Sequence, residues 1–259
     1  MVWYADDTTL LSTDFNMLQL ATRQMEESCK KYGLKINGNK CKVISDEEIH
    51  EITVEDKAID KVQEFVFLGS VLPGTSSDIN RRIALATVAF GKLKKNIWAH
   101  KTIPMKLKIR LYYALIIPIA TYSCATWTLT KEDSRKLRVF ENNCLRIMLQ
   151  IKLSDRISIE KIHKKAGTSN NIVNIVKKQR LTWFGHICRL PENSMVKNIF
   201  KDDFTKKRES GRPPKKWIDQ IKEDTGLPPL TAEKYSKDRV RWRRLVNNKW
   251  AKLHKEVRN

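Results

Sequence analysis

The sequence lacks the cysteine pattern of a disulfide framework or of a simple zinc module. It contains five cysteines, an odd number, and no C-x-x-C pair. Small secreted domains carry an even set of cysteines for their disulfides, and zinc modules carry closely paired ligands. We therefore expect free thiols in a reducing compartment.

The sequence also has no long hydrophobic run. Its longest apolar stretch, residues 111–127, is short for a bilayer span and contains Pro118 and Ser123. We expect this stretch to form a buried, kinked helix and the protein to have no membrane partner. The first residues lead directly into Asp6 and Asp7 without the pattern of a signal peptide. We expect an intracellular protein of the nucleus or cytoplasm, not a secreted one.

Acidic residues are scarce relative to basic ones, and their distribution is uneven. The 259 residues include 50 Lys and Arg against 29 Asp and Glu, a net charge of +21. Residues 1–75 carry 8 basic and 13 acidic residues, whereas residues 76–259 carry 42 and 16. This division predicts an acidic front part that holds a cation and a back part that binds a polyanion. The alternative is a solubility bias spread over exposed helices.

The local patterns that are present indicate an α+β chain. Residues 2–4 and 8–11 have the β-branched and aliphatic side chains of a hairpin, with Asp6 and Asp7 at its tip. Asp14 and Gly33 predict the start and end of one amphipathic helix, and short strands continue to Leu68. Apolar residues at helical spacing then predict helices over residues 77–99, 104–115, 130–147, 172–188, 214–225 and 232–255, with a charged linker at 201–214. We expect a small part built of β-hairpins and one helix, followed by a mostly α-helical remainder.

The two adjacent aspartates are candidate metal ligands. A hairpin tip holds two hard oxygen ligands close together, as Mg²⁺ requires. Phosphoryl transfer with two metal ions needs at least one further carboxylate. The alternative is that Asp6 and Asp7 are solvated turn residues, a position that aspartate favours.

The order of motifs resembles one protein family. Tyr4-Ala5-Asp6-Asp7 resembles the Tyr/Phe-x-Asp-Asp box of reverse transcriptases. The later segments are similar, in the same order, to those of the non-LTR (LINE-type) retrotransposon branch: Gly33–Asn37 with Lys40–Lys42, Phe65–Ser70, Leu111–Trp127, Arg180–His186 and Gly211–Trp217. The resemblance covers essentially the whole chain.

This resemblance implies RNA-directed DNA synthesis. Asp6 and Asp7 would bind the two Mg²⁺ ions, Asp6 more directly, and Tyr4 would lie near the primer terminus. Phe67, Leu68 and Gly69 would belong to the primer grip. Lys40 or Lys42 would approach the nucleotide phosphates, although Cys41 stands where the family has threonine. The implied partners are an RNA template and a DNA primer or target DNA.

The sequence departs from the family ahead of the hairpin. The family places another catalytic aspartate and the finger segments before this box, whereas Met1, Val2 and Trp3 precede it here. We expect a C-terminal piece of a polymerase that is inactive alone. It would comprise a partial palm (residues 1–75), a helical thumb-like region (76–128) and a basic nucleic-acid-binding region (129–259). The alternatives are a non-catalytic nucleic-acid-binding protein derived from a retroelement and a helical scaffold for protein partners.

Basic residues lie beside tryptophans at two places in the back part. We expect phosphate contacts from Arg212, Lys215 and Lys216 beside Trp217, and from Arg241, Arg243 and Arg244 beside Trp242. The tryptophans have two interpretations, as residues that stack on nucleic-acid bases or as core residues. His186 and Cys188 match no zinc-knuckle spacing, and we assign them no metal.

The charge excess predicts the salt dependence of nucleic-acid binding. Affinity for RNA or DNA should fall steeply with salt concentration, because each phosphate contact releases a condensed counterion. Fluorescence anisotropy with a labelled oligonucleotide over a salt series measures this slope. An affinity that does not change with salt would contradict phosphate contact as the basis of binding.

Overall fold

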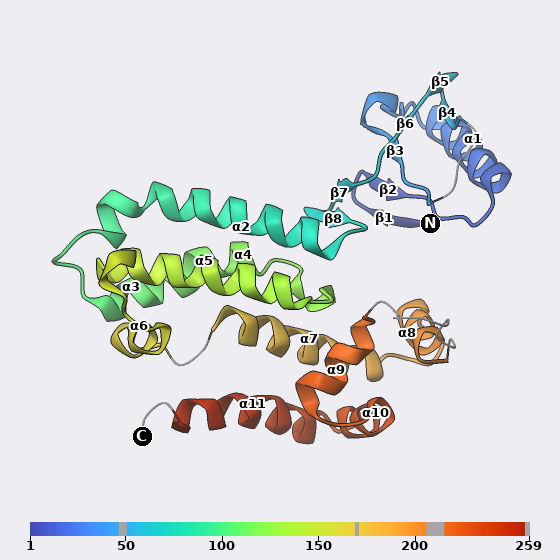
Figure 1. Cartoon of the computed structure of the whole chain (residues 1–259). Helices are drawn as coiled ribbons and strands as arrows, with labels where there is room; N and C mark the ends of the chain where they lie inside the picture. Colours follow the sequence, from blue (N-terminus) through green and yellow to red (C-terminus); the bar gives the residue numbers. More distant parts are fainter. Residues whose placement is uncertain (47–50, 169–170, 206–214, 257–259) are drawn as a thin grey trace. The chain divides into compact units, whose positions relative to one another are not determined.

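The chain divides into two compact units. The computed structural model describes residues 1–46, 51–168, 171–205 and 215–256. The units are Met1–Gly74 and Thr75–Asn259, and Figure 1 shows both. In the described part of the chain all strands lie in the first unit, and the second unit is helical. This arrangement confirms the expected α+β class, with a small β part and a helical remainder.

The first unit contains four pairs of short strands. Three are antiparallel hairpins, β1–β2, β4–β5 and β7–β8, and the fourth, β3–β6, is parallel. Within the described residues these pairs do not join into one hydrogen-bonded sheet. The strands are β1 (Val2–Tyr4), β2 (Asp7–Thr9), β3 (Lys42–Val43), β4 (Thr53–Val54), β5 (Lys57–Ala58), β6 (Asp60–Lys61), β7 (Phe65–Phe67) and β8 (Ser70–Leu72).

One helix, α1 (Phe15–Lys31), accompanies these strands. The Asp14 side chain accepts a hydrogen bond from the Met17 amide at 2.8 Å and caps the first turn. Gly33 follows the last turn with a φ of 69°, the left-handed conformation in which glycine has no steric penalty. Both ends of the predicted helix are thereby confirmed.

A side-chain amide joins α1 to β4. Gln19 accepts a hydrogen bond from the Thr53 amide at 3.0 Å and donates one to the Thr53 carbonyl at 3.2 Å. The amide group therefore pairs with β4 as a neighbouring strand would. Ile52 and Val54, on either side of Thr53, are buried and form part of this small core.

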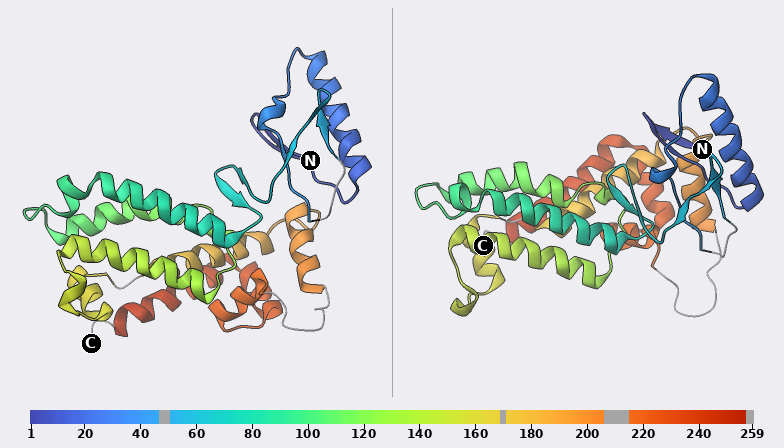
Figure 2. Two further views of the ribbon diagram at one scale, coloured as in Figure 1. Left: turned by 45° about the horizontal axis from the view of Figure 1, so that its top comes forward. Right: turned by 90° about the horizontal axis from the view of Figure 1, so that it is seen from above.

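The second unit is a stack of helices around two hydrophobic cores. In Figure 1, α2, α5, α7 and α11 lie in successive layers, and each packs against the next. Its α-helices are α2 (Thr75–Lys92), α3 (Met105–Leu111), α4 (Ile117–Ala120), α5 (Lys131–Leu149), α6 (Ile159–Ala166), α7 (Ile172–Cys188), α8 (Met195–Thr205), α9 (Trp217–Thr225), α10 (Pro229–Lys237) and α11 (Arg239–Glu256). Figure 2 shows the same layers from two further directions.

The helix α7 connects the two cores. Its first half contributes Ile172, Val173 and Val176 to the larger core, which α2 to α6 complete. Its second half contributes Leu181 and Phe184, with Cys188, to the smaller core under α9, α10 and α11. The position of α7 therefore fixes how the two halves of this unit pack.

Three sequence expectations differ from the structure in their local detail. The linker expected at 201–214 is wrong for residues 201–205, which belong to α8, and residues 206–214 lie outside the described residues. Residues 111–127 do not form one kinked helix, because the helix ends at Ala120 in α4 and a 3₁₀ turn at Cys124–Thr126 follows. The helix is irregular at the π-helical turn Tyr112–Ile116, which precedes Pro118. Proline cannot donate a backbone hydrogen bond, which disrupts the regular helical ladder. The single helix expected over residues 232–255 is divided at Asp238. The Asp238 carboxylate accepts from the amides of Val240 and Arg241 and thereby caps α11.

Buried acidic side chains stabilise helix starts in the second unit. Asp133 and Thr130 form a reciprocal capping box at the start of α5. Glu141 on α5 accepts from the Ile172 amide at the start of α7, with both carboxylate oxygens at 3.1 Å. Burial raises the pKa of Glu141 to about 7.

Within the described residues, no helix combines the length and the apolar character that a bilayer span requires.

A close contact between α7 and α11 depends on a glycine. A Cβ atom on Gly185 would lie 2.4 Å from Nε1 of Trp242, too close for any real contact. That indole N–H donates to the Leu181 carbonyl at 2.8 Å. Gly185 therefore lets the Trp242 ring reach the backbone of α7.

Gly185→Ala should lower the free energy of unfolding by about 1–3 kcal/mol, because the added methyl displaces Trp242 from its hydrogen bond. Chemical denaturation followed by tryptophan fluorescence measures the change. Gly91→Ala is the matched control, since a Cβ at Gly91 on α2 would meet nothing within 4 Å. That control should be neutral or stabilising by up to about 1 kcal/mol. Equal effects of the two substitutions would contradict the close approach.

Candidate functional site

Asp6 and Asp7 lie at the tip of the β1–β2 hairpin. Tyr4 pairs with Asp7, so Ala5 and Asp6 form the two-residue turn. Ala5 has a φ of 54°, a left-handed conformation that costs a non-glycine residue about 1 kcal/mol. Both carboxylates are exposed, and the Tyr4 side chain is 67% exposed. The hairpin presents its acidic and aromatic groups to solvent.

The donor set at this hairpin is incomplete for a two-metal site. Among the described residues, no group of three or more His, Cys, Asp or Glu side chains is placed to hold a metal ion. Two adjacent carboxylates on one hairpin do not supply the bridging ligands that two Mg²⁺ ions need. Asp6 and Asp7 therefore do not form the implied magnesium site by themselves.

The two candidate phosphate-binding lysines have different surroundings. Lys40 ends a short 3₁₀ turn (Gly38–Lys40) and is exposed. Lys42 begins β3, and its Nζ lies 2.5 Å from Oδ2 of Asp60 on β6. The Lys42 charge is thus already compensated within the first unit.

Phe67, Leu68 and Gly69 lie at the β7–β8 turn. Phe67 pairs with Ser70, and Leu68 and Gly69 form the turn with φ values of 46° and 85°. Two consecutive residues with positive φ are typical of a type I′ hairpin turn. Leu68 is 39% exposed at this tip. Within the described residues, no strand pairing joins this hairpin to the one that carries Asp6 and Asp7.

The first group of basic residues lies at the start of α9. Arg212 lies outside the described residues, so its expected contact stays a prediction. Lys215 is exposed, and its Nζ lies 2.7 Å from Oε2 of Glu223. Lys216 is the N-cap of α9, and its amide donates to Asp219 at 2.9 Å.

The second group of basic residues lies at the start of α11. Arg241, Arg243 and Arg244 are exposed, while Trp242 between them is buried against α7. The Arg241 guanidinium lies 3.8 Å from the centre of the Tyr235 ring. Trp242 is therefore a core residue, and the three arginines beside it are exposed to solvent.

One face of α9 binds the segment that joins α4 to α5. Trp217 Nε1 donates to the Ala125 carbonyl and Gln220 Nε2 to the Leu129 carbonyl, each at 2.9 Å. Ala125 lies in a 3₁₀ turn (Cys124–Thr126) and Leu129 lies just before α5, so α9 satisfies carbonyl groups outside the regular helices. Trp217 also packs against Phe184 in the smaller core. Its indole ring has a structural role here.

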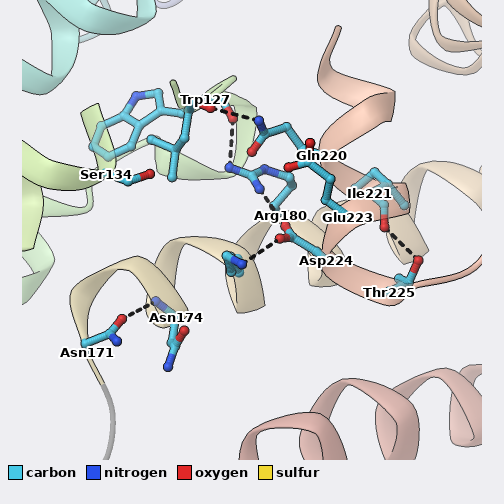
Figure 3. Close-up of polar contacts among 12 residues, drawn as sticks. Trp127, Ser134, Asn171, Asn174, Arg180, Gln220, Ile221, Glu223, Asp224 and Thr225 are labelled. Carbon is cyan, nitrogen blue, oxygen red and sulfur yellow. Dashed lines mark hydrogen bonds and ion pairs between the residues drawn. The ribbon is translucent and has the colours of Figure 1, made fainter. Parts of the chain in front are cut away.

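Arg180 completes this contact (Figure 3). It is fully buried, and its guanidinium donates to Asp224 on α9 at 2.5 Å and to the Trp127 carbonyl at 3.0 Å. Lys177 Nζ lies 3.2 Å from the other oxygen of Asp224. The Trp127 indole in turn donates to Asp78 on α2 at 2.8 Å. A continuous polar chain therefore crosses the helical unit from α2 to α9.

Sequence reasoning did not single out Arg180 or Asp224. The available signal was positional, because Arg180 follows Val173 and Val176 at the spacing of an apolar helix face. A charged residue at a core position indicates a buried ion pair. The partner of that pair, 44 positions away, has no local signal.

The comparisons with known proteins agree with the hairpin motif. Residues 1–72 match the family described as reverse transcriptase (RNA-dependent DNA polymerase). The chain is also similar to a putative uncharacterized transposon-derived protein of Caenorhabditis elegans, with 23% identity over 258 residues and 92% of each chain covered. No solved structure matches the chain significantly. The two matches support a reverse-transcriptase-related protein of a transposable element.

Proposed function

We propose that this chain is a nucleic-acid-binding protein derived from the reverse transcriptase of a non-LTR retrotransposon, and that it does not polymerise DNA by itself. The observation that carries the proposal is the exposed aspartate pair on a hairpin within residues 1–72, the segment that matches the reverse transcriptase family. RNA and DNA are the substrates that this family match implies.

The expected inactivity rests on the number of ligands. Asp6 and Asp7 are two carboxylates on one hairpin, and the described residues bring no third His, Cys, Asp or Glu to them. Asp14, the next acidic residue along the chain, caps α1 and is engaged there. Polymerisation therefore requires a further carboxylate from outside the described residues.

The other residues of the first unit have positioning roles in this proposal. Tyr4 beside the aspartates is exposed enough to lie against a primer terminus. Phe67, Leu68 and Gly69 present a hairpin turn as a primer grip. Lys40 is the better candidate for a nucleotide phosphate, because Lys42 is paired with Asp60.

The helical unit supplies the nucleic-acid contacts. We propose that residues 76–128 correspond to a thumb-like region and residues 129–259 to a basic nucleic-acid-binding region, with Arg241, Arg243 and Arg244 exposed for phosphate contact. A nucleic-acid-binding protein with a vestigial hairpin is the second candidate. The excess of basic residues favours this second candidate as well. It differs from the first candidate only in that Asp6 has no role in catalysis.

Primer extension separates these candidates. Extension of a DNA primer on an RNA template, with Mg²⁺ or Mn²⁺, should remain at background for the chain alone. Addition of a palm segment that carries the missing aspartate should restore extension, and Asp6→Asn should abolish the restored activity. Asp14→Asn is the matched control, since asparagine caps a helix as well as aspartate does.

Two results would contradict the proposal. Extension by the chain alone that Asp6→Asn removes would show that another carboxylate of this chain completes the site. Restored extension that Asp6→Asn leaves unchanged would favour the vestigial hairpin.

A further inference from the structure

The helical unit has a strongly basic surface that the proposed function does not use. No acidic residue occurs between Asp78 and Glu132 in the sequence. Residues 92–110 and 146–165 together contain thirteen Lys and Arg, against Asp155 and Glu160 only. These two segments alone account for about half of the net charge of +21.

The structure brings the two segments together at one end of the helical unit. The helix α3 packs against both α5 and α6. Lys108 Nζ donates to the Trp98 carbonyl at 2.7 Å and to the Met148 carbonyl at 3.4 Å. Gln150 Nε2 donates to the Ala99 carbonyl at 2.9 Å. Figures 1 and 2 show the end of α2 with α3 and α6 at this same end of the unit.

Eleven of the thirteen cationic side chains are exposed there. We call them the distal basic surface: Lys92, Lys94, Lys95, Lys101, Lys106, Arg110, Lys152, Arg156, Lys161, Lys164 and Lys165. In the part of the chain that the structure describes, none of them forms an ion pair within 4.0 Å. Asp155, one of the two acidic residues, accepts from the Lys152 amide in a cap. Among the described residues, these positive charges therefore have no ion-pair partner.

The two remaining cations are structural and hold the surface in shape. Lys108 on α3 is buried. Its ammonium group donates to the carbonyls of Trp98 and Met148 and so joins α3 to the turn after α2 and to α5. Arg146 donates to the carbonyls of Lys152 and Ile157, which fixes the connection between α5 and α6. The exposed charges therefore stand on a folded, multi-helix platform, not on a mobile tail.

The surface presents no exposed Phe, Tyr or Trp ring on which a single strand could stack its bases, and His100 is its one exposed aromatic side chain. Trp98 is the one Phe, Tyr or Trp in residues 92–110 and 146–165, and it is fully buried, with its Nε1 bonded to the Phe90 carbonyl. Proteins that bind single strands stack bases on exposed aromatic rings. Cations spread over a rigid surface without such rings favour the phosphate backbone of a duplex.

We propose that the distal basic surface binds the phosphate backbone of double-stranded nucleic acid without sequence preference. This inference rests on the proposed nucleic-acid-binding function and locates a contact that neither Lys215 and Lys216 nor the arginines of α11 supply.

Neutralisation of lysines tests the proposal on the full chain. The test variant is Lys92→Gln, Lys94→Gln, Lys95→Gln and Lys101→Gln, which removes four exposed charges from the surface. A second variant, Lys161→Gln, Lys164→Gln and Lys165→Gln, removes three from the α6 side. The control combines Arg23→Gln, Lys30→Gln, Lys31→Gln and Lys57→Gln, four exposed cations of the first unit. Fluorescence anisotropy with a labelled duplex and the matching single strand is recorded over a salt series, and circular dichroism checks folding.

Both surface variants should weaken duplex binding at least about tenfold at low salt. Each lysine that contacts a phosphate should lower the slope of log K against log salt by about 0.9. The control and the single-strand affinities should change much less. If the wild-type chain binds duplex with a steep salt slope and both surface variants match the control, the proposed function stands and this inference fails. If the wild-type chain binds neither duplex nor single strand, both fail.

Discussion

The arrangement of the helical unit depends on one buried guanidinium. Arg180 lies on α7 where the two hydrophobic cores meet, and it binds Asp224 on α9 and the backbone carbonyl of Trp127. Burial of an ion pair is costly in itself, and loss of one partner leaves an uncompensated charge in the interior. Among the described residues, Nε of Arg180 has no hydrogen-bond partner. The bonds from the other two guanidinium nitrogens, to Asp224 and to the Trp127 carbonyl, therefore offset the cost of burying the charge. The pair therefore enforces one relative placement of α7, α9 and the segment between α4 and α5.

The buried carboxylates of the helical unit also have polar partners. Asp78, Asp133, Glu141 and Asp224 are all buried. Their carboxylates accept hydrogen bonds from the Trp127 indole, the Thr130 amide, the Ile172 amide and the Arg180 guanidinium, respectively. These carboxylates are used for internal contacts and are withdrawn from the surface. Arg82, Lys108, Arg180 and Lys197 are buried as well, so in the described part of this unit burial removes as many cations as carboxylates from the surface. The exposed excess of positive charge therefore follows the composition, and it is prominent at the distal basic surface.

Local features of the fold were predictable from the sequence because their causes are local. The Asp14 cap, the glycine after α1, the Thr130 and Asp133 capping box and the bounds of α7 each depend on residues within a few positions. The aspartate hairpin belongs to the same class, since turn residues between β-formers define it. The break at Asp238 was missed because the apolar spacing continues across it, and the cap that divides the helix competes with that pattern.

Features that depend on tertiary contact were not predictable in this way. Residues 92–110 and 146–165 are separated by more than thirty positions, and their joint charge becomes apparent only when α3 packs on α6. Lys215, in contrast, belongs to a basic cluster in the sequence but is paired with Glu223 in the structure. Sequence clustering of charge and surface clustering of charge therefore differ in this chain.

Cross-linking of the full chain to an RNA–DNA duplex, with the cross-linked peptides identified by mass spectrometry, tests the central claim most directly. The claim is that the helical unit binds nucleic acid through exposed lysine and arginine side chains that have no ion-pair partner among the described residues. The account predicts cross-links concentrated in residues 92–110 and 146–165, with further ones in the first turns of α11. Cross-links confined to residues 1–74, or spread evenly over all exposed lysines, would contradict it.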